Sequence, residues 1–404
     1  MSYDVNRLRA RIPALQDGTA YFDGPGGTQT PDLVAQAIAG ALAAPLSNRG
    51  RGNLAERRAD DFTIGARLAG ADLVNADPRG VVFGRSMTEL CFMLARTLAH
   101  EWGPGDEVVV TRLDHDANVR PWVRAAEAAG ATVRWVPFDA KTAALSTDDV
   151  AAVLGPATKV VAITGASNLL GTRPDLRAIG ELVHRTGALF VVDGVHLTAH
   201  AGIDMQAIGA DVYLCSPYKF LGPHLGMLAA SPALLETLHP DKLLPATEQV
   251  PERFELGTLP YELLAGVTMA VDMLADLVPG GEDELPRRDR IVRSMQALED
   301  YEDALHQRLR QGLESVPGIT LYCHAPHRTP TELFALANLP ADQVSVRLAE
   351  VGINAPAGSF YAIEAADWIG LGAPGAVRVG LAPYTSTEDV DRLIQALHTI
   401  AATD

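Results

Sequence analysis

The sequence has few cysteines, a deficit of positive charge and no long apolar run. Only Cys91, Cys215 and Cys323 occur among 404 residues, without a C-x-x-C pair, which argues against a disulfide framework or a cysteine zinc site and fits a reducing compartment. Lys and Arg number 33 against 50 Asp and Glu, and the resulting net charge of −17 would repel nucleic acid and anionic lipid. We therefore expect a small-molecule substrate, with no nucleic acid and no membrane as partners.

The N-terminal residues 1–15 contain no apolar core of the kind found in signal peptides, and no segment supplies about 20 uninterrupted apolar residues. A cytoplasmic location is the expectation from these two features. Apolar residues make up 48% of the chain, so a folded protein is expected rather than a disordered one. The length favours a large domain with a smaller companion.

Strand and helix patterns alternate from about residue 60 to residue 230. The candidate strands are almost continuously apolar, as is typical of strands buried on both faces, and amphipathic helices at 88–101, 117–129 and 174–186 lie between several of them. This pattern predicts an α/β fold with a mainly parallel, doubly wound, seven-stranded sheet. The strands are expected at 81–84, 107–112, 131–138, 158–165, 188–193, 211–216 and 226–231.

The flanking regions predict an N-terminal arm and a second domain. Residues 1–18 read as one short amphipathic helix, and an acidic break containing Pro and Gly near 279–286 reads as a hinge. We expect an arm at 1–19, a large domain at 20–265 and a smaller C-terminal α/β domain at 266–404. Its helices are expected at 287–315, 341–352 and 387–400, and its strands at 318–323, 332–339 and 375–382.

Asp193 and Lys219 follow two successive strands of the predicted sheet. In open α/β sheets, ligands bind outside the carboxyl ends of the strands, so the two side chains are expected to face one crevice. Pyridoxal 5′-phosphate (PLP) requires this pair, because a lysine holds it as a Schiff base and a carboxylate keeps its ring nitrogen protonated. Taken alone, the pair also fits a helix cap and a surface lysine.

Other strand ends carry residues that suit the same cofactor. SMTEL (86–90) begins a helix, whose free N–H groups and Thr88 hydroxyl suit a phosphate. His115 could stack on an aromatic ring, and Asn168 with His196 could bond a phenolate oxygen. Each also has a simpler interpretation as a helix cap, a buried histidine or a turn residue. The ligand-type residues in DHD (114–116) and HLTAH (196–200) are better explained as cofactor contacts or helix surface, so no metal site is predicted. The basic loop at 47–58 fits an anionic substrate's entrance and an ordinary solvated loop equally well.

Six motifs together resemble a known family. They are LDHDANVRPW (113–122), ASNLLGT (166–172), VVDGVH (191–196), CSPYKFLGPHLG (215–226), FELGT (254–258) and VRVGLAPYTSTEDVDRL (377–393). In their types and in their order along the chain, these motifs are similar to those of the class V aminotransferase superfamily of fold-type I PLP enzymes. The cysteine desulfurase-like branch matches best, and isopenicillin N epimerases are more distant.

The resemblance implies a role for each matching residue. Lys219 would hold PLP and later accept the α-proton, Asp193 would pair with the ring nitrogen, and His115 would stack on the ring. Contacts with the phenolic oxygen would come from Asn168 and His196. The phosphate would be held by the backbone at Met87 and by Thr88, Ser216 and Tyr218.

The resemblance also implies partners. Thr258 would reach the phosphate of a neighbouring subunit, which implies a homodimer with shared active sites. Arg378 would bind the α-carboxylate of an amino-acid substrate through its planar guanidinium.

One departure bears on the reaction. Cysteine desulfurases carry a nucleophilic cysteine on a loop before the carboxylate-binding arginine, whereas residues 354–372 contain none, Tyr361 lies near its position and Pro356 replaces an arginine that often precedes it. This favours β-elimination, as in a C–S lyase, without the usual enzyme thiol. Aminotransferase and epimerase chemistry stay open, and a PLP-fold protein that binds without turnover is the alternative from another class.

Overall fold

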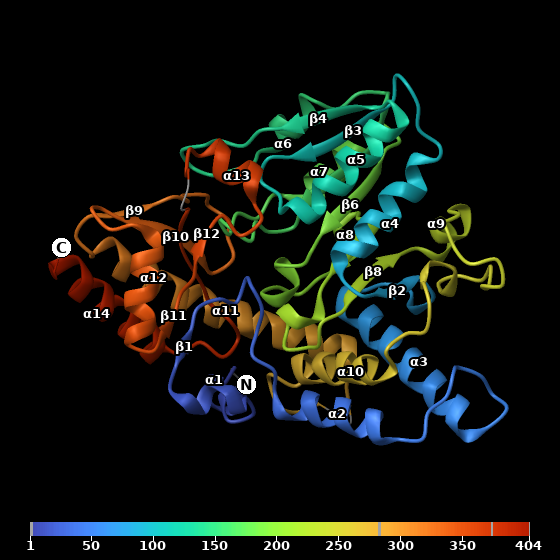
Figure 1. Cartoon of the computed structure of the whole chain (residues 1–404), viewed down its shortest axis with the longest axis horizontal. Coiled ribbons are helices and arrows are strands. Elements are labelled where there is room, and N and C mark those ends of the chain that lie inside the picture. Colours follow the sequence, from blue (N-terminus) through green and yellow to red (C-terminus); the bar gives the residue numbers. More distant parts are fainter. Residues whose placement is uncertain (1–2, 282–283, 373–374, 404) are drawn as a thin grey trace.

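In a computed structural model, which describes residues 3–281, 284–372 and 375–403, the chain forms a large mixed sheet and a smaller antiparallel sheet side by side (Figure 1). The seven strands of the large sheet lie in the order β2-β8-β7-β6-β5-β3-β4, and β2 and β8 run antiparallel to their neighbours. The predicted fold class is therefore confirmed. The strands are β2 (Val81–Gly84), β3 (Glu107–Thr111), β4 (Thr132–Val136), β5 (Thr158–Thr164), β6 (Leu189–Asp193), β7 (Val212–Cys215) and β8 (Gly226–Ala230).

The large sheet is buried on both faces, which explains its continuous apolar runs. Along β6, Phe190 and Val192 enter one core and Val191 enters the other. The face of Val191 is covered by α4 (Met87–Ala99) and α5 (Arg120–Ala129). The opposite face is covered by α3 (Leu54–Val74), α7 (Leu176–His184), α8 (Met205–Ile208) and α10 (Tyr261–Ala275). Short helices α6 (Thr147–Ala151) and α9 (Pro232–Thr237) complete this part of the chain.

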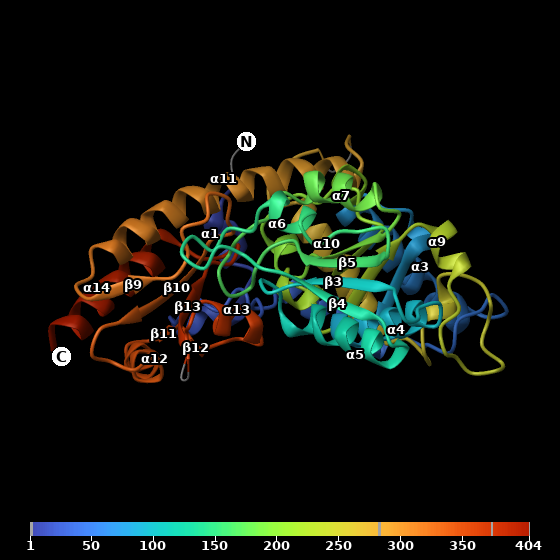
Figure 2. The same cartoon turned by 90° about the horizontal axis from the view of Figure 1, so that it is seen from above.

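The smaller sheet has the order β12-β13-β10-β9 and a core of its own. Its strands are β9 (Ile319–Leu321), β10 (Thr331–Leu336), β12 (Ala357–Gly358) and β13 (Ala376–Gly380). The helices of this region are α12 (Ala341–Glu350), α13 (Ile363–Trp368), α14 (Thr387–Thr403) and the long α11 (Arg287–Glu314). Figure 2 shows α11 lying along both regions, and it contacts α3 and α10 as well as α14.

The N-terminal segment differs from the prediction. Instead of one helix over 1–18, whose first two residues lie outside the described part, there are α1 (Val5–Arg9) and a 3₁₀ turn at Pro13–Asp17. Pro13 is the physical reason, because a residue that precedes proline is pushed out of the helical region, and Ile12 is extended at φ −116° and ψ 98°.

The chain then pairs with its C-terminal part before it enters the large sheet. Strands β1 (Ala20–Tyr21) and β11 (Ile353–Asn354) form a separate two-stranded parallel sheet, and α2 (Asp32–Ala43) follows. The domain limits at residues 20 and 266 stay predictions. None of the helices in the described residues is long and apolar enough to cross a membrane.

Candidate active site

The carboxyl ends of β5, β6 and β7 open onto one cavity. Strands β6 and β7 run in parallel, with Asp193 paired to Leu214, so the turn after β7 brings Lys219 to the same edge as Asp193. Nine of the predicted residues line this cavity: Met87, Thr88, His115, Asn168, Asp193, His196, Ser216, Tyr218 and Lys219. An adjoining cavity of about 610 Å³ shares six lining residues with it, including Lys219, and reaches Arg378. The structure therefore brings these ten residues together.

Thr258 lies elsewhere. It lines a separate hollow with Gly84, Arg85 and Glu89, beside the start of α4. A contact between Thr258 and the cofactor would need a second subunit, so its role stays a prediction.

The turn after Asp193 is held by close packing. A Cβ atom at Gly194 would collide with the ring of Tyr213, whose hydroxyl lies 2.9 Å from the Thr198 hydroxyl. The backbone N–H of Val195 donates to Asp193 Oδ1 at 2.9 Å. These contacts fix the direction of a carboxylate that is only 4% exposed.

Burial shifts the acid and the base of the cavity toward their neutral forms. Burial raises the pKa of Asp193 to about 6, so the carboxylate is still largely ionised at neutral pH. Burial and the nearby charge of Arg378 lower the pKa of Lys219 to about 8. Near pH 8, about half of the free amine is therefore neutral and able to accept a proton.

His115 is a neutral ring at this edge. Burial, followed by the charges of Lys219 and Arg378, lowers its pKa to about 4. Its Nδ1 accepts the N–H of Ala117 at 3.0 Å, which leaves the ring proton on Nε2. The ring stacks on Tyr361 with centroids 5.6 Å apart and planes 27° apart.

A second buried acid lies behind Asp193. Asp114 Oδ1 accepts from Asn118 Nδ2 at 2.7 Å, and its other oxygen accepts from the Thr111 hydroxyl. Burial raises the pKa of Asp114 to about 8, so it is largely protonated at neutral pH and leaves Asp193 as the charged carboxylate.

Two polar atoms of the cavity are buried without a protein partner. Asn168 donates through Nδ2 to the Phe360 carbonyl at 3.0 Å, and His196 Nε2 lies 2.9 Å from the Thr329 hydroxyl. Asn168 Oδ1 and His196 Nδ1 have no hydrogen-bond partner among the described residues. Because unpaired buried polar atoms cost free energy, they indicate a ligand that would satisfy them.

Arg378 is 2% exposed and held on several sides. Nη1 donates to the Asn168 carbonyl at 3.0 Å, Nη2 forms an ion pair with Asp23, and the guanidinium carbon lies 3.7 Å from the Phe360 ring centroid. Asp23 and Phe360 were not among the residues predicted from the sequence. The available signal for Asp23 is the DGPGG stretch that begins there, whose glycines and proline are typical of a turn.

Comparison with known proteins agrees with this geometry. The model of the family described as aminotransferase class-V matches residues 20–393. The chain belongs to this family. Relatives of this chain include an uncharacterised protein of Mycobacterium tuberculosis, 36% identical over 399 residues that cover 98% of this chain and 99% of the relative. Another is the aminotransferase-like protein FGM3 of Gibberella zeae, 31% identical over 99% of both chains.

Solved structures point to the same branch. The cysteine desulfurase CsdA of Escherichia coli superposes with a TM-score of 0.87 at 26% identity, covering 100% of this chain and 99% of that one. This confirms the predicted cysteine desulfurase-like branch of the class-V aminotransferases. Members of the family use PLP, so the chain is a PLP-dependent enzyme.

The residues of the cavity fit PLP. The N-terminus of α4, with Met87 and Thr88 in its first turn, offers N–H groups that have no partner within the helix, which suits a phosphate. Asp193 would supply the carboxylate for the ring nitrogen, and Lys219 would supply the amine. Asn168 Oδ1 and His196 Nδ1, which have no hydrogen-bond partner among the described residues, are available to polar atoms of the cofactor or of the substrate.

The positions of the three cysteines bear on the chemistry of this site. Cys91 on α4, Cys215 at the end of β7 and Cys323 are all buried. Burial raises the pKa of the Cys91 and Cys215 thiols, which disfavours the reactive thiolate. No cysteine is among the described residues that line the two cavities around Lys219.

Proposed function

We propose that this member of the aminotransferase class-V family acts on an amino acid by removing the α-proton and then a β-leaving group, as a C–S lyase does, without an enzyme thiol. The supporting observation is that Lys219, Asp193 and Arg378 lie together around connected cavities whose described lining contains no cysteine.

Substrate binding is assigned to Arg378. A planar guanidinium suits a carboxylate, and its burial keeps water from competing for it. Its present partner, Asp23, is 34% exposed at its side chain. The Asp23 carboxylate can therefore turn toward solvent when the carboxylate of a substrate takes its place.

Proton transfer is assigned to Lys219. Bound PLP supplies an electron sink for the negative charge that forms when the α-proton leaves. With PLP bound, the ionised Asp193 would stabilise positive charge at the ring nitrogen, and the neutral His115 would contact the ring without adding a charge. The lowered pKa of Lys219 keeps its amine available as the general base.

In β-elimination, loss of the α-proton is followed by cleavage of the Cβ–S bond with departure of a thiolate. Water then converts the remaining three-carbon fragment into a keto acid and ammonia. No step of this sequence transfers sulfur to the protein, which agrees with residues 354–372 containing no cysteine.

Transamination is the second candidate, favoured by the similarity to an aminotransferase-like protein of Gibberella zeae. Epimerisation requires only return of the proton to the opposite face. A binder without turnover is disfavoured, because Lys219, Asp193, His115 and Arg378 would then serve no chemistry.

The test uses the cofactor-loaded protein in deuterated water with single amino acids, with and without a keto acid. Elimination releases a keto acid and ammonia without any second substrate. Transamination produces a new amino acid only when a keto acid is added, and epimerisation yields deuterated enantiomer alone. Either of the last two results would overturn the lyase assignment.

We further propose that the chain is a cytoplasmic homodimer, with Thr258 of one subunit near the phosphate of the other. Supporting this, Thr258 lies beside the start of α4 and away from its own Lys219 cavity. Sedimentation of the wild-type protein tests the dimer, and mixing Thr258→Ala with Lys219→Ala subunits tests whether sites are shared.

A further inference from the structure

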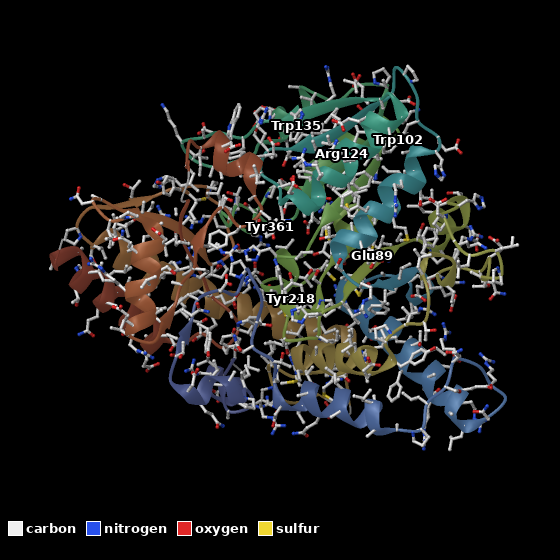
Figure 3. The ribbon with its side chains drawn as sticks, viewed as in Figure 1. Glu89, Trp102, Arg124, Trp135, Tyr218 and Tyr361 are labelled. Carbon is white, nitrogen blue, oxygen red and sulfur yellow. The ribbon has the colours of Figure 1, made fainter. Side chains whose placement is uncertain are left out.

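The segment Ser359–Tyr361 lies between β12 and α13 and borders the larger cavity. Phe360 and Tyr361 both line this cavity together with Lys219 and Arg378. In Figure 3, Tyr361 and Tyr218 lie near the junction of the two regions of the molecule. The segment occupies the part of the chain where cysteine desulfurases carry their nucleophilic thiol.

Backbone hydrogen bonds hold this segment on the large-domain side of the cavity. The N–H of Asp116 donates to the Tyr361 carbonyl at 2.8 Å, and Asn168 Nδ2 donates to the Phe360 carbonyl at 3.0 Å. Helix α13, which follows, is tied to the same side by an ion pair of 2.9 Å between Glu364 and Arg112. The aromatic rings are therefore held in place relative to Lys219.

Phe360 and Tyr361 both adopt left-handed backbone conformations, with φ values of +54° and +59°. Bulky residues rarely adopt such values, and the strain persists only where surrounding contacts determine the conformation. Tyr361 is also 73% exposed, so burial in the core does not account for its ring. A strained, exposed aromatic residue at the rim of a cavity points to a role in ligand contact.

Among the described residues, the charged side chains of this cavity leave its outer part without an unpaired charge. Asp116 pairs with Arg120 at 3.0 Å, and Asp23, whose side chain is 34% exposed, turns toward solvent when a substrate carboxylate replaces it on Arg378. The remaining outer lining includes the rings of Phe92, His115, Phe360 and Tyr361. The outer cavity therefore suits an uncharged group that packs against aromatic rings.

We propose that Phe360 and Tyr361 determine substrate specificity and select amino acids whose side chains are uncharged and apolar or aromatic. The inference rests on the proposed function, because it assumes that Arg378 holds the α-carboxylate. Tyr361 then contacts the substrate side chain with its ring, in the region where a desulfurase presents a thiol.

The experiment titrates the full-length, cofactor-loaded protein with L-alanine, L-aspartate, L-methionine and L-phenylalanine and follows the visible absorbance to obtain apparent Kd values. Methionine and phenylalanine are expected to bind at least about 10-fold more tightly than alanine or aspartate, given the stacking and area that they add. Tyr361→Ala should weaken phenylalanine and methionine binding roughly 3- to 10-fold and leave alanine unchanged.

Two variants control this result. Tyr361→Phe keeps the ring and should retain the preference, and Val346→Ala removes an exposed apolar side chain on α12 and should change no Kd. Equal binding of aspartate and methionine, or an equal loss for all four amino acids in Tyr361→Ala, would overturn the inference.

The same titrations separate this inference from the proposed function. If the preference is absent but amino acids still change the absorbance and lose their α-proton to deuterated water, the specificity assignment fails alone. If no amino acid changes the absorbance or exchanges its proton, both assignments fail.

Discussion

Two groups of buried charged side chains can be compared. The lysine cluster consists of Lys219, Asp193, His115 and Arg378, and its acid and its bases are shifted toward their neutral forms. The glutamate cluster consists of Glu332, His306, Arg310 and Arg328 in the small region. Burial raises the pKa of Glu332, but the hydrogen bond from His306 and the charge of Arg328 outweigh this effect and lower the pKa to about 2.

The geometry explains this difference. One oxygen of Glu332 lies 2.6 Å from Arg328 and 2.8 Å from His306, and the other lies 3.2 Å from Arg310. In the lysine cluster, Asp193 receives one backbone N–H, while Asn168 Oδ1 and His196 Nδ1 nearby remain unpaired. Both oxygens of Glu332 are paired within the protein, so its charge serves stability, whereas the unpaired atoms beside Asp193 line a cavity and are available to a ligand.

The largest effect is expected for Lys219→Ala. Loss of the amine removes both the covalent link to PLP and the general base, so turnover should fall by about 10⁴-fold. After borohydride reduction, mass spectrometry should find cofactor on the wild-type protein and none on the variant. A variant with substantial turnover would remove Lys219 from the mechanism.

Glu332→Gln should destabilise the fold by about 3–5 kcal/mol, because Arg328 and Arg310 lose the buried charge that they surround. Urea unfolding measures this change. The matched control is Asp391→Asn, which breaks an exposed ion pair with Arg308 and should cost no more than about 1 kcal/mol. Equal effects of the two variants would contradict the assigned role of burial.

Arg378→Lys should raise the KM of the amino-acid substrate roughly 10- to 100-fold, since an ammonium cannot form the paired bonds of a guanidinium. Steady-state kinetics give KM, and the absorbance of bound PLP should stay unchanged. Arg328→Lys is the matched change in the glutamate cluster, and there stability should fall while KM stays constant. A reversed pattern would show that the two clusters do not divide binding and stability in this way.

The last variant, Asp114→Asn, is expected to change the pH dependence of stability. Between its ordinary pKa of 3.8 and about 8, folded Asp114 holds a proton that the unfolded chain has lost, so its contribution to stability declines as pH rises. Asparagine cannot titrate, so the variant should lose this decline, which amounts to up to about 1.4 kcal/mol of unfolding free energy per pH unit. Urea unfolding at pH 5, 6, 7 and 8 measures it, and parallel curves for variant and wild type would refute the buried, protonated state.

The main strands and the residues after them could be predicted because both depend on local sequence. Apolar runs located all seven strands of the large sheet to within about two residues, for example 131–138 against Thr132–Val136, and Asp193 and Lys219 follow such runs. The prediction that Asp193 and Lys219 face one cavity then follows from a general rule, because ligands bind outside the carboxyl ends of parallel strands.

Other parts of the site depend on contacts that no local pattern encodes. Asp23 and Arg378 are 355 positions apart in sequence and meet only because β1 pairs with β11 beside the small sheet. Phe360 and Tyr361 take backbone values typical of glycine or asparagine, so their residue types do not signal the turn.

The packing of Gly194 under Tyr213 has a consequence for how the protein can change over generations. Because even a methyl group at position 194 would overlap the tyrosine ring, position 194 is not free to vary while Tyr213 is in place. A descendant with alanine at 194 would first need a smaller residue at 213, and that residue would give up the hydrogen bond to Thr198. Substitutions in this turn can therefore occur only in a restricted order. The direction in which Asp193 points is kept for as long as Gly194 and Tyr213 are kept.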